Sequence, residues 1–158
     1  MSNRCRIRKI GENEIEQVCT LISEVFDEFI APLQDQKGID TFYSIVNPQG
    51  LKQKLEEGGF ILTAELDGAM AGIAGIRDNN HLFLLFIKKE YQGKGIGREL
   101  VQRAITECLK SDPDINELTV NSSPNAVPVY KRIGFIPTSV EQVKEGLRYT
   151  PMVLDLDR

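Results

Sequence analysis

Histidine and cysteine are scarce in this chain of 158 residues, which contains one histidine and three cysteines. Zinc sites are built from clustered histidine, cysteine and carboxylate ligands, so we expect no metal. Cys5, Cys19 and Cys108 lie far apart and form no C-x-x-C pair. Cys19 and Cys108 fall on apolar helix faces, where a thiol packs as a small hydrophobic group. Free thiols are typical of the reducing cytoplasm, which is the location we expect.

Long apolar runs and an excess of positive charge are also missing. No apolar run approaches the roughly 18 residues that a transmembrane helix needs, so we expect no membrane partner. The net charge of −4 provides no basic field for phosphate, which argues against nucleic acid as a partner. Hydrophobic residues make up 41% and charged residues 27%, as in globular proteins. Because no repeat or linker divides the chain, we predict a single domain over residues 1–158.

Glycine is concentrated in one short segment, Gln-Gly-Lys-Gly-Ile-Gly, at residues 92–97. An apolar run of strand length at 82–87 precedes this segment, and residues 96–109 carry apolar side chains at the spacing of one helix face. Glycines allow the backbone to approach a ligand closely, and the free N–H groups at a helix start favour an anion. The order of strand, glycine-rich loop and helix therefore predicts a phosphate site.

The spacing of the glycines excludes two common phosphate motifs. Neither the dinucleotide fingerprint G-x-G-x-x-G nor the P-loop G-x-x-x-x-G-K-[ST] is present. The segment reads instead Q-x-x-G-x-G, from Gln92 to Gly97. A second segment, Asn-Ala-Val-Pro-Val-Tyr-Lys-Arg-Ile-Gly-Phe, follows at residues 125–135.

Together the two segments resemble the Q-x-x-G-x-G and A-x-x-x-Y-x-x-x-G-F signatures of the GNAT superfamily of acyl-CoA-dependent N-acyltransferases. The resemblance implies an α/β (α+β) fold with a central mixed, mostly antiparallel sheet that splays between its fourth and fifth strands, flanked by helices. It also implies an N-acetyltransferase that uses acetyl-CoA as acyl-donor co-substrate and a primary amine of a small molecule or peptide as acceptor. Transfer would be direct, in a ternary complex, because no cysteine lies in either motif. The oligomeric state stays open, a homodimer included.

The sequence pattern predicts a matching order of elements. Asn13 and Glu16 resemble a capping box at the start of a helix that stops at Pro32. Asp67-Gly68 is a hairpin turn signal, and Gly134 is expected to end a helix. The predicted strands span 6–10, 60–66, 69–77, 81–87, 117–121 and 147–156, and a further strand is expected to begin at Phe135. The predicted helices span 15–29, 39–46, 50–57, 96–109 and 126–133, with a polar loop at 34–38.

The resemblance assigns the cofactor contacts to two stretches of backbone and to an asparagine. Backbone groups of Leu85, Phe86 and Ile87 would bind the pantetheine arm. The segment is also explained as an apolar strand buried on both faces, and both interpretations can hold together because the backbone binds while the side chains pack. The residues expected to hold the pyrophosphate are Gln92, Gly93, Lys94, Gly95, Ile96, Gly97 and Arg98. Lys94 and Arg98 are equally well explained as solvated surface residues.

The asparagine common in the family is replaced here by Ser123. Asn121 or Asn125 would take over its contact with the pantetheine arm, although Asn125 is also a candidate helix N-cap. Lys131 and Arg132 are candidates for the 3′-phosphate of the cofactor, but a solvated helix face is the preferred interpretation.

Acyl transfer to an amine requires a proton for the departing thiolate and a neutral amine. Tyr130 occupies the family's general-acid position; packing on a helix face is the alternative. His81 lies eleven residues before Gln92. The resemblance implies a general base at this offset, a glutamate in the histone-acetylating branch and a histidine in the arylalkylamine-acetylating branch. Alternation predicts that His81 shares a strand face with every second residue up to Ile87, and an inert histidine beside the turn at 78–80 is the alternative.

Acceptor choice in the family depends on segments that correspond to residues 26–57 and 139–149. The first segment contains four acidic residues that either bind a cationic amine or are simply solvated: Asp27, Glu28, Asp35 and Asp40. Two other functions stay open. One is a non-catalytic acyl-CoA sensor, and the other is a transferase for a longer acyl chain or for a protein N-terminus.

Overall fold

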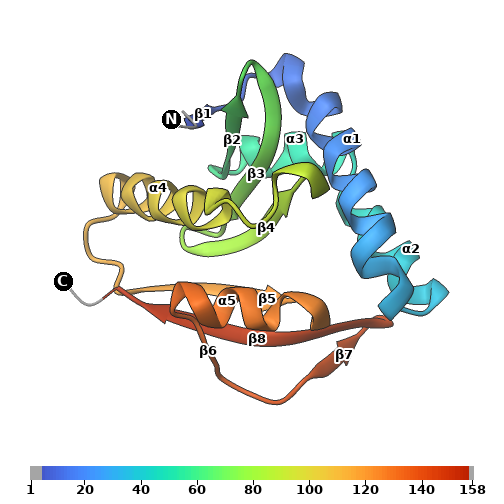
Figure 1. Cartoon of the computed structure of the whole chain (residues 1–158). Coiled ribbons are helices and arrows are strands. Elements are labelled where there is room, and N and C mark those ends of the chain that lie inside the picture. The colour runs from blue at the N-terminus through green and yellow to red at the C-terminus, as the bar shows by residue number, and fades with distance from the viewer. Residues whose placement is uncertain (1–4, 157–158) are drawn as a thin grey trace.

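A computed structural model describes residues 5–156, which form a mixed sheet of eight strands with helices on both faces (Figure 1). The strands are β1 (Cys5–Lys9), β2 (Phe60–Leu66), β3 (Ala69–Arg77), β4 (His81–Ile87), β5 (Glu117–Ser122), β6 (Ile136–Pro137), β7 (Gln142–Lys144) and β8 (Leu147–Asp155). The helices are α1 (Ile15–Val25), α2 (Gln36–Ile45), α3 (Pro48–Glu56), α4 (Ile96–Ser111) and α5 (Val127–Ile133). Within residues 5–156, none of the helices is long and apolar enough to cross a membrane.

The strands lie in the order β1-β2-β3-β4-β5-β8-β6, and β7 pairs with β8. Of the strand pairs in the described residues, β4–β5 is parallel and the others are antiparallel. The sheet is therefore mixed and mostly antiparallel, which confirms the predicted fold class.

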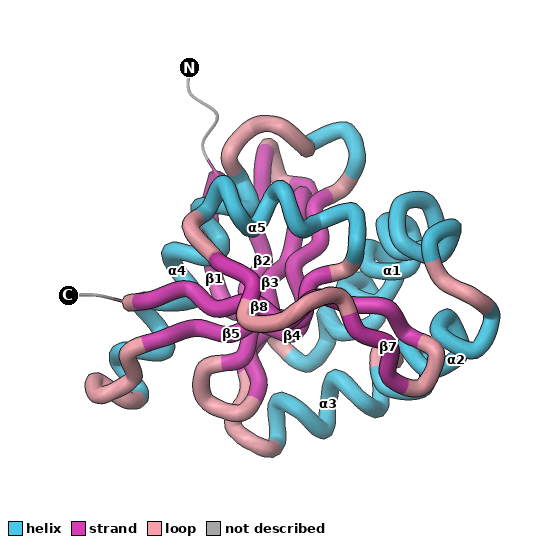
Figure 2. The backbone as a smooth tube through the Cα atoms, turned by 90° about the horizontal axis from the view of Figure 1, so that it is seen from below, coloured by secondary structure: helices cyan, strands magenta, loops and turns pink. Residues whose placement is uncertain are grey.

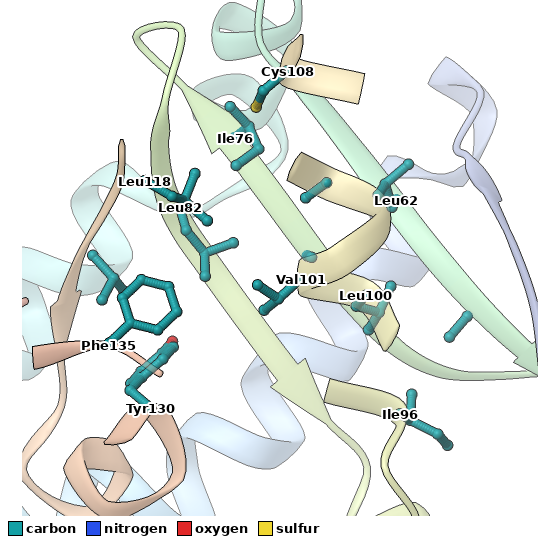
Figure 3. Close-up of a cluster of buried hydrophobic side chains, with 14 of the residues drawn as sticks. Leu62, Ile76, Leu82, Ile96, Leu100, Val101, Cys108, Leu118, Tyr130 and Phe135 are labelled. Atoms are coloured by element: carbon teal, nitrogen blue, oxygen red, sulfur yellow. The ribbon is translucent and has the colours of Figure 1, made fainter. Parts of the chain in front are cut away.

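Each face of the sheet has its own hydrophobic core. On one face, Leu100, Val101 and Ala104 of α4 belong to a buried cluster with Tyr130 and Phe135 (Figure 3). On the other face, α1, α2 and α3 cover the sheet, and α1 buries Val18 and Ile22 together with side chains of β3 and β4. Figure 2 shows α4 and α1 on different sides of the strands. The apolar stripes that predicted amphipathic helices are the residues buried in these two cores.

The sheet opens between β4 and β5. The two strands pair at His81↔Thr119 and Leu82↔Val120, and the register contains no further pair. Beyond Leu82, the edge of β4 that faces β5 therefore has no strand partner among the described residues. Backbone N–H and C=O groups without a partner are costly unless a ligand or water satisfies them, so this free edge is a natural binding surface.

A β-bulge at Phe83 changes which side chains of β4 share a face. Gly75 pairs with Leu84 and Ile76 pairs with Leu82, so that Phe83 is an extra residue in the ladder. Leu85 and Ile87 consequently pack toward the α4 core, whereas Phe83 packs against the α1–α3 core. Since Leu82 belongs to the α4 core, its neighbour His81 faces α1–α3. The prediction of one shared face from His81 to Ile87 is therefore wrong. Side chains of β4 pack toward the cores on both faces, as expected of an apolar strand, although residues 81, 83, 85 and 87 are only half-buried.

Two helices begin differently from the prediction. Before α1, the carboxylate of Glu14 accepts a hydrogen bond from the Gly11 N–H at 2.9 Å, so this pair forms the capping contact assigned above to Asn13 and Glu16. The helix also continues beyond Val25 as a π-helical turn over Phe26–Ile30. The segment predicted as a polar loop at 34–38 contains the start of α2, because the Asp35 side chain accepts from the Gly38 N–H at 2.9 Å.

Candidate active site

A cavity of about 820 Å³ lies where β4 and β5 separate. Its walls come from β4, the glycine-rich loop at 92–97, the β5–α5 segment, the α1–α2 segment and the β7–β8 hairpin. The cavity brings together both predicted catalytic residues, Tyr130 and His81. It also includes every predicted cofactor residue except Lys94, whose side chain is exposed and does not line it.

The glycine-rich loop has an open surface at the start of α4. Gly93 and Gly95 have φ values of +78° and +84°, in the left-handed region where a side chain is strained. A Cβ built at either glycine would have no neighbouring atom within 4 Å. Ile96 is buried and anchors the first turn of α4 in the core. The free N–H groups of that turn therefore border open space, which is the arrangement that binds an anion.

Two polar side chains of this region hold elements together. The Gln92 Nε2 donates to the Ile87 carbonyl oxygen at 3.0 Å and ties the loop to the end of β4. The Arg98 Nη2 donates to the Arg132 carbonyl oxygen at 2.7 Å and links α4 to α5. The side chains of Arg98 and Arg132 both line the cavity, whereas Lys131 does not. Arg98 and Arg132 thus bring positive charge to the end of the cavity next to the loop.

The backbone of β4 presents alternate residues to the opening. The Lys88 N–H donates to the Ala71 carbonyl at 2.9 Å, so at this position the backbone points toward β3. Successive residues of a strand direct their hydrogen-bonding groups to opposite edges. Alternation then directs the groups of Phe86 to β3 and those of Leu85 and Ile87 to the opening. Leu85 and Ile87, rather than Phe86, are the residues that can add backbone hydrogen bonds to a ligand.

The asparagine candidates lie at different places on β5 and beyond it. Asn125 accepts a hydrogen bond at its Oδ1 from the Ser123 Oγ at 2.8 Å. It lies inside a short 3₁₀ turn, Pro124–Ala126, whose N-cap residue is Ser123, so the N-cap interpretation of Asn125 is wrong. Asn121 lies on the face of β5 opposite to Val120, which is in the α4 core, and therefore faces the α1–α2 side of the cavity.

Tyr130 combines the two roles weighed for it. Its ring packs edge-on against Phe135, with centroids 5.3 Å apart, and its side chain is buried. The hydroxyl points from α5 toward β4 (Figure 3). Burial raises the pKa of Tyr130 above its ordinary value, which keeps the hydroxyl protonated at neutral pH. The residue is thus packed and also available as a proton donor on the wall of the cavity.

His81 lies at the point where the two halves of the sheet part. Its Nδ1 is 2.8 Å from the Thr119 Oγ1, on the strand that pairs with it. Burial, and secondly the charge of Arg77, lower the pKa of His81 to about 4, while Asp78 acts in the opposite direction. The imidazole is therefore neutral at pH 7, but it is a weaker base than a histidine of ordinary pKa.

The four acidic residues considered as a cation site are engaged elsewhere. Asp27 accepts from the Tyr43 hydroxyl at 2.6 Å, Glu28 pairs with the Lys89 Nζ at 3.1 Å, and Asp40 accepts from the Gln36 Nε2 at 2.8 Å. Asp35 caps α2. None of these four residues lines the cavity. Within residues 5–156, no group of three His, Cys, Asp or Glu side chains is placed to hold a metal ion.

Sequence reasoning missed the aromatic wall and the charges around His81. Phe26 and Phe42 stack with ring centroids 3.9 Å apart and line the cavity, although each lies in a segment predicted only as a helix. Arg77 is the cross-strand partner of His81. The signal for Arg77 was available, because the hairpin at 69–87 sets this pairing, whereas the contact between Phe26 and Phe42 depends on how two helices pack.

Comparison with known proteins agrees with this geometry. The family profile described as acetyltransferase (GNAT) domain matches residues 30–156. The chain belongs to the GNAT acetyltransferase family. This GNAT domain is 32% identical over 85 residues to a Bacillus subtilis protein provisionally named a [ribosomal protein bS18]-alanine N-acetyltransferase. That match spans 51% of the chain and 56% of the relative, so the chain matches only about half of the relative's length.

Solved structures share the GNAT fold over nearly the whole chain. PaiA N-acetyltransferase from Thermoplasma acidophilum, in complex with coenzyme A, superposes with a TM-score of 0.79 at 19% identity, covering 98% of this chain and 99% of that one. YncA from Salmonella typhimurium, provisionally named an acetyltransferase and solved with acetyl-CoA, gives a TM-score of 0.70 at 22% identity, covering 98% and 95%. At these identities the likeness shows the fold.

Proposed function

We propose that this GNAT domain transfers an acetyl group from acetyl-CoA to a primary amine of a small molecule. The observation that carries the proposal is the single cavity that joins the anion-binding loop, the free edge of β4, Tyr130 and His81. The loop suits the pyrophosphate and the free edge suits the amide-rich pantetheine arm. The coenzyme A and acetyl-CoA named for the similar PaiA and YncA structures support the same choice of cofactor.

Different residues would donate and accept the protons of the reaction. The amine nitrogen forms a bond to the thioester carbonyl carbon, the C–S bond breaks, and the sulfur takes a proton from the Tyr130 hydroxyl. The N–H of Leu85 or Ile87 donates to the carbonyl oxygen as negative charge develops on it. The amine loses its proton to His81, directly or through a water, or to solvent. Proton acceptance by His81 needs the tautomer in which the Nδ1–H donates to Thr119 and leaves Nε2 free.

The positions of the thiols support transfer without a covalent acyl-enzyme. Cys5, Cys19 and Cys108 do not line the cavity. Burial raises the pKa of each thiol, that of Cys108 to about 11, so none of the three is an activated thiolate.

A second candidate is acetylation of a protein N-terminus. The similarity to the Bacillus subtilis protein, whose name specifies an alanine of a ribosomal protein, favours it. A peptide that begins with alanine therefore belongs in any acceptor screen.

The test is a screen for CoA release from acetyl-CoA with single amines, with the acetylated product identified by mass spectrometry. Release that depends on the amine supports the proposal. Tight binding of acetyl-CoA by calorimetry, without release for any amine or peptide, would overturn it and identify an acyl-CoA sensor.

A further inference from the structure

The part of the cavity away from the glycine-rich loop has an aromatic lining. Five aromatic residues line it, from four elements of the chain: Phe26, Phe29, Phe42, Phe83 and Tyr149. Phe26 is only 1% exposed and Phe86 is also buried, so these two rings support Phe42 from behind, with centroids 3.9 Å and 6.2 Å from that of Phe42, while the half-buried Phe29, Phe42 and Phe83 offer surface to a ligand. Such a wall gains free energy by burying apolar surface of a ligand.

The lining has few carboxylates. Among the described residues around the cavity, Glu145 is the one carboxylate, and the basic residues are Arg77, Arg98, Arg132, Lys144 and Arg148. Arg77 and Arg148 are each paired with a carboxylate outside the lining, Asp78 and Glu141 respectively. Arg98 and Arg132 lie toward the loop, and Arg77, Lys144 and Arg148 lie in the segments of the aromatic part. A ligand that carries a second ammonium group into this part would meet no pair of carboxylates to compensate its desolvation.

The roof of the aromatic part consists of the α1–α2 segment and the β7–β8 hairpin. Contacts between these distant segments hold it in place. The Gln34 side chain binds both backbone groups of Arg148, accepting from its N–H at 2.8 Å and donating to its carbonyl at 3.2 Å. The Thr41 hydroxyl donates to the Glu145 carbonyl at 2.6 Å. Figures 1 and 2 both show α2 beside the β7–β8 hairpin. This side of the cavity is therefore bridged, which suits a small molecule better than an extended peptide.

From the apolar lining, its scarcity of carboxylates and its bridged roof, we infer that the acceptor is an amine with a single positive charge on an apolar alkyl or arylalkyl body, and is not a polyamine. The inference rests on the proposed function, since it names the acceptor of the same site. The apolar body lies against the aromatic wall, and the amine nitrogen points toward the opening between His81 and Tyr130.

The matched acceptors n-hexylamine and 1,6-diaminohexane test the inference, because they share a chain and differ by one ammonium group. We expect kcat/KM to be at least about tenfold higher for hexylamine, a difference of about 1.4 kcal/mol. 2-Phenylethylamine should resemble hexylamine, and spermidine should resemble the diamine. Equal or higher kcat/KM for the diamine or spermidine, or a peptide with N-terminal alanine that exceeds every small amine, would overturn the inference.

A charge reversal on the lining gives an independent check. Lys144→Glu should reduce the preference for hexylamine over the diamine by threefold or more, because it places a carboxylate on the wall of the cavity (roughly 0.7 kcal/mol). The control is Lys52→Glu, which makes the same change of net charge on α3 at a residue that does not line the cavity. If both variants changed the preference for hexylamine equally, or if neither changed it, the result would count against the inference.

Binding separates a failure of this inference from a failure of the proposed function. The two amines are titrated by calorimetry into the protein saturated with coenzyme A. Tighter binding of hexylamine without any acetylation would support the acceptor class and overturn the transferase. Acetylation with no preference between the amines would do the reverse.

Discussion

The Nδ1 of His81 and the Oγ1 of Thr119 lie 2.8 Å apart at the first of the two paired positions between β4 and β5. This contact joins the two halves of the sheet at the closed end of the cavity. It also orients the imidazole, because one ring nitrogen is engaged and the other is left for the acceptor side. His81 therefore has a structural contact and a free nitrogen at the same time, and substitution is needed to separate the two roles.

Replacing His81 should change the pH profile at a lower pH than a histidine of ordinary pKa would. With the pKa lowered to about 4, kcat/KM of the wild type should fall only as the pH approaches about 4, rather than between 6 and 7. His81→Gln should reduce kcat/KM at pH 7 by roughly tenfold, below the usual range for a general base because the imidazole is weakly basic. Activity should recover partly at high pH, where the amine deprotonates without help. An unaltered profile in His81→Gln would exclude the base role.

Urea unfolding of the wild type and of His81→Gln at different pH values tests the burial of His81 independently of activity. The folded-state pKa of His81 is about 4, below its ordinary value of 6.5. Its contribution to stability is therefore complete above about 6.5 and is lost as the pH falls toward 4. The wild type should lose more stability than His81→Gln between pH 7 and pH 5 in urea unfolding. Profiles that are parallel would show that the histidine is not buried as described.

Removing the hydroxyl of Tyr130 should slow turnover without unfolding the protein. Tyr130→Phe keeps the edge-on contact with Phe135, so its Tm and its affinity for acetyl-CoA should stay close to those of the wild type. General acid catalysis is typically worth about 10²–10⁴-fold, and kcat should fall within that range. The measurement is steady-state CoA release beside calorimetry. A fall of less than about threefold would leave Tyr130 with its packing role alone.

Much of the sheet could be predicted from sequence because its signals are local. The bounds of β2, β3 and β4 agree with the prediction, since the turns between them have clear signatures. Asp67 and Gly68 both have positive φ, +55° and +81°, as the hairpin signal requires. The glycine that precedes α4 was equally readable, because a left-handed residue at a helix start needs a glycine.

The remaining features depend on contacts that the order of residues does not reveal. A run such as His-Leu-Phe-Leu-Leu-Phe-Ile gives no sign that Phe83 is an extra residue, because the bulge is defined by the pairing of β4 with β3. Gln34 and Arg148 lie 114 residues apart, so no spacing pattern in the sequence could predict their contact. The opening of the sheet itself was expected from the family resemblance and not from periodicity.

A carboxylate at Gly95 should weaken binding of acetyl-CoA. Gly95→Asp introduces no clash in the free protein, since no atom lies within 4 Å of the Cβ position. The added charge would stand where the pyrophosphate is expected, and the backbone could no longer approach it. We expect at least about a tenfold loss of affinity by calorimetry, which is about 1.4 kcal/mol.

Two controls separate charge from backbone strain in that variant. Gly58→Asp has the same left-handed strain, with φ of +100° and no atom within 4 Å, but lies after α3 away from the cavity. It should bind acetyl-CoA like the wild type. Gly95→Asn has the size of aspartate without its charge and should bind between the two. Wild-type affinity in Gly95→Asp would show that the glycine-rich loop does not hold the cofactor.

The contact between Gly38 and Gly146 should be required for acceptor binding but not for cofactor binding. A Cβ on Gly38 would lie 2.4 Å from the Gly146 carbonyl oxygen, which is backbone and cannot move aside cheaply. Gly38→Ala should therefore push α2 away from the β7–β8 hairpin and lower stability by about 2 kcal/mol, or roughly 4–8 °C in Tm. The bridged roof would open, so KM for the amine should rise while the affinity for acetyl-CoA, bound at the other end, stays unchanged.

Gly11→Ala is the control, because its Cβ would meet the flexible Asn13 side chain at 2.9 Å on an exposed turn. If Gly38→Ala lowered the Tm and left KM for the amine at the wild-type value, the contact would serve folding alone and the roof would have no part in acceptor binding.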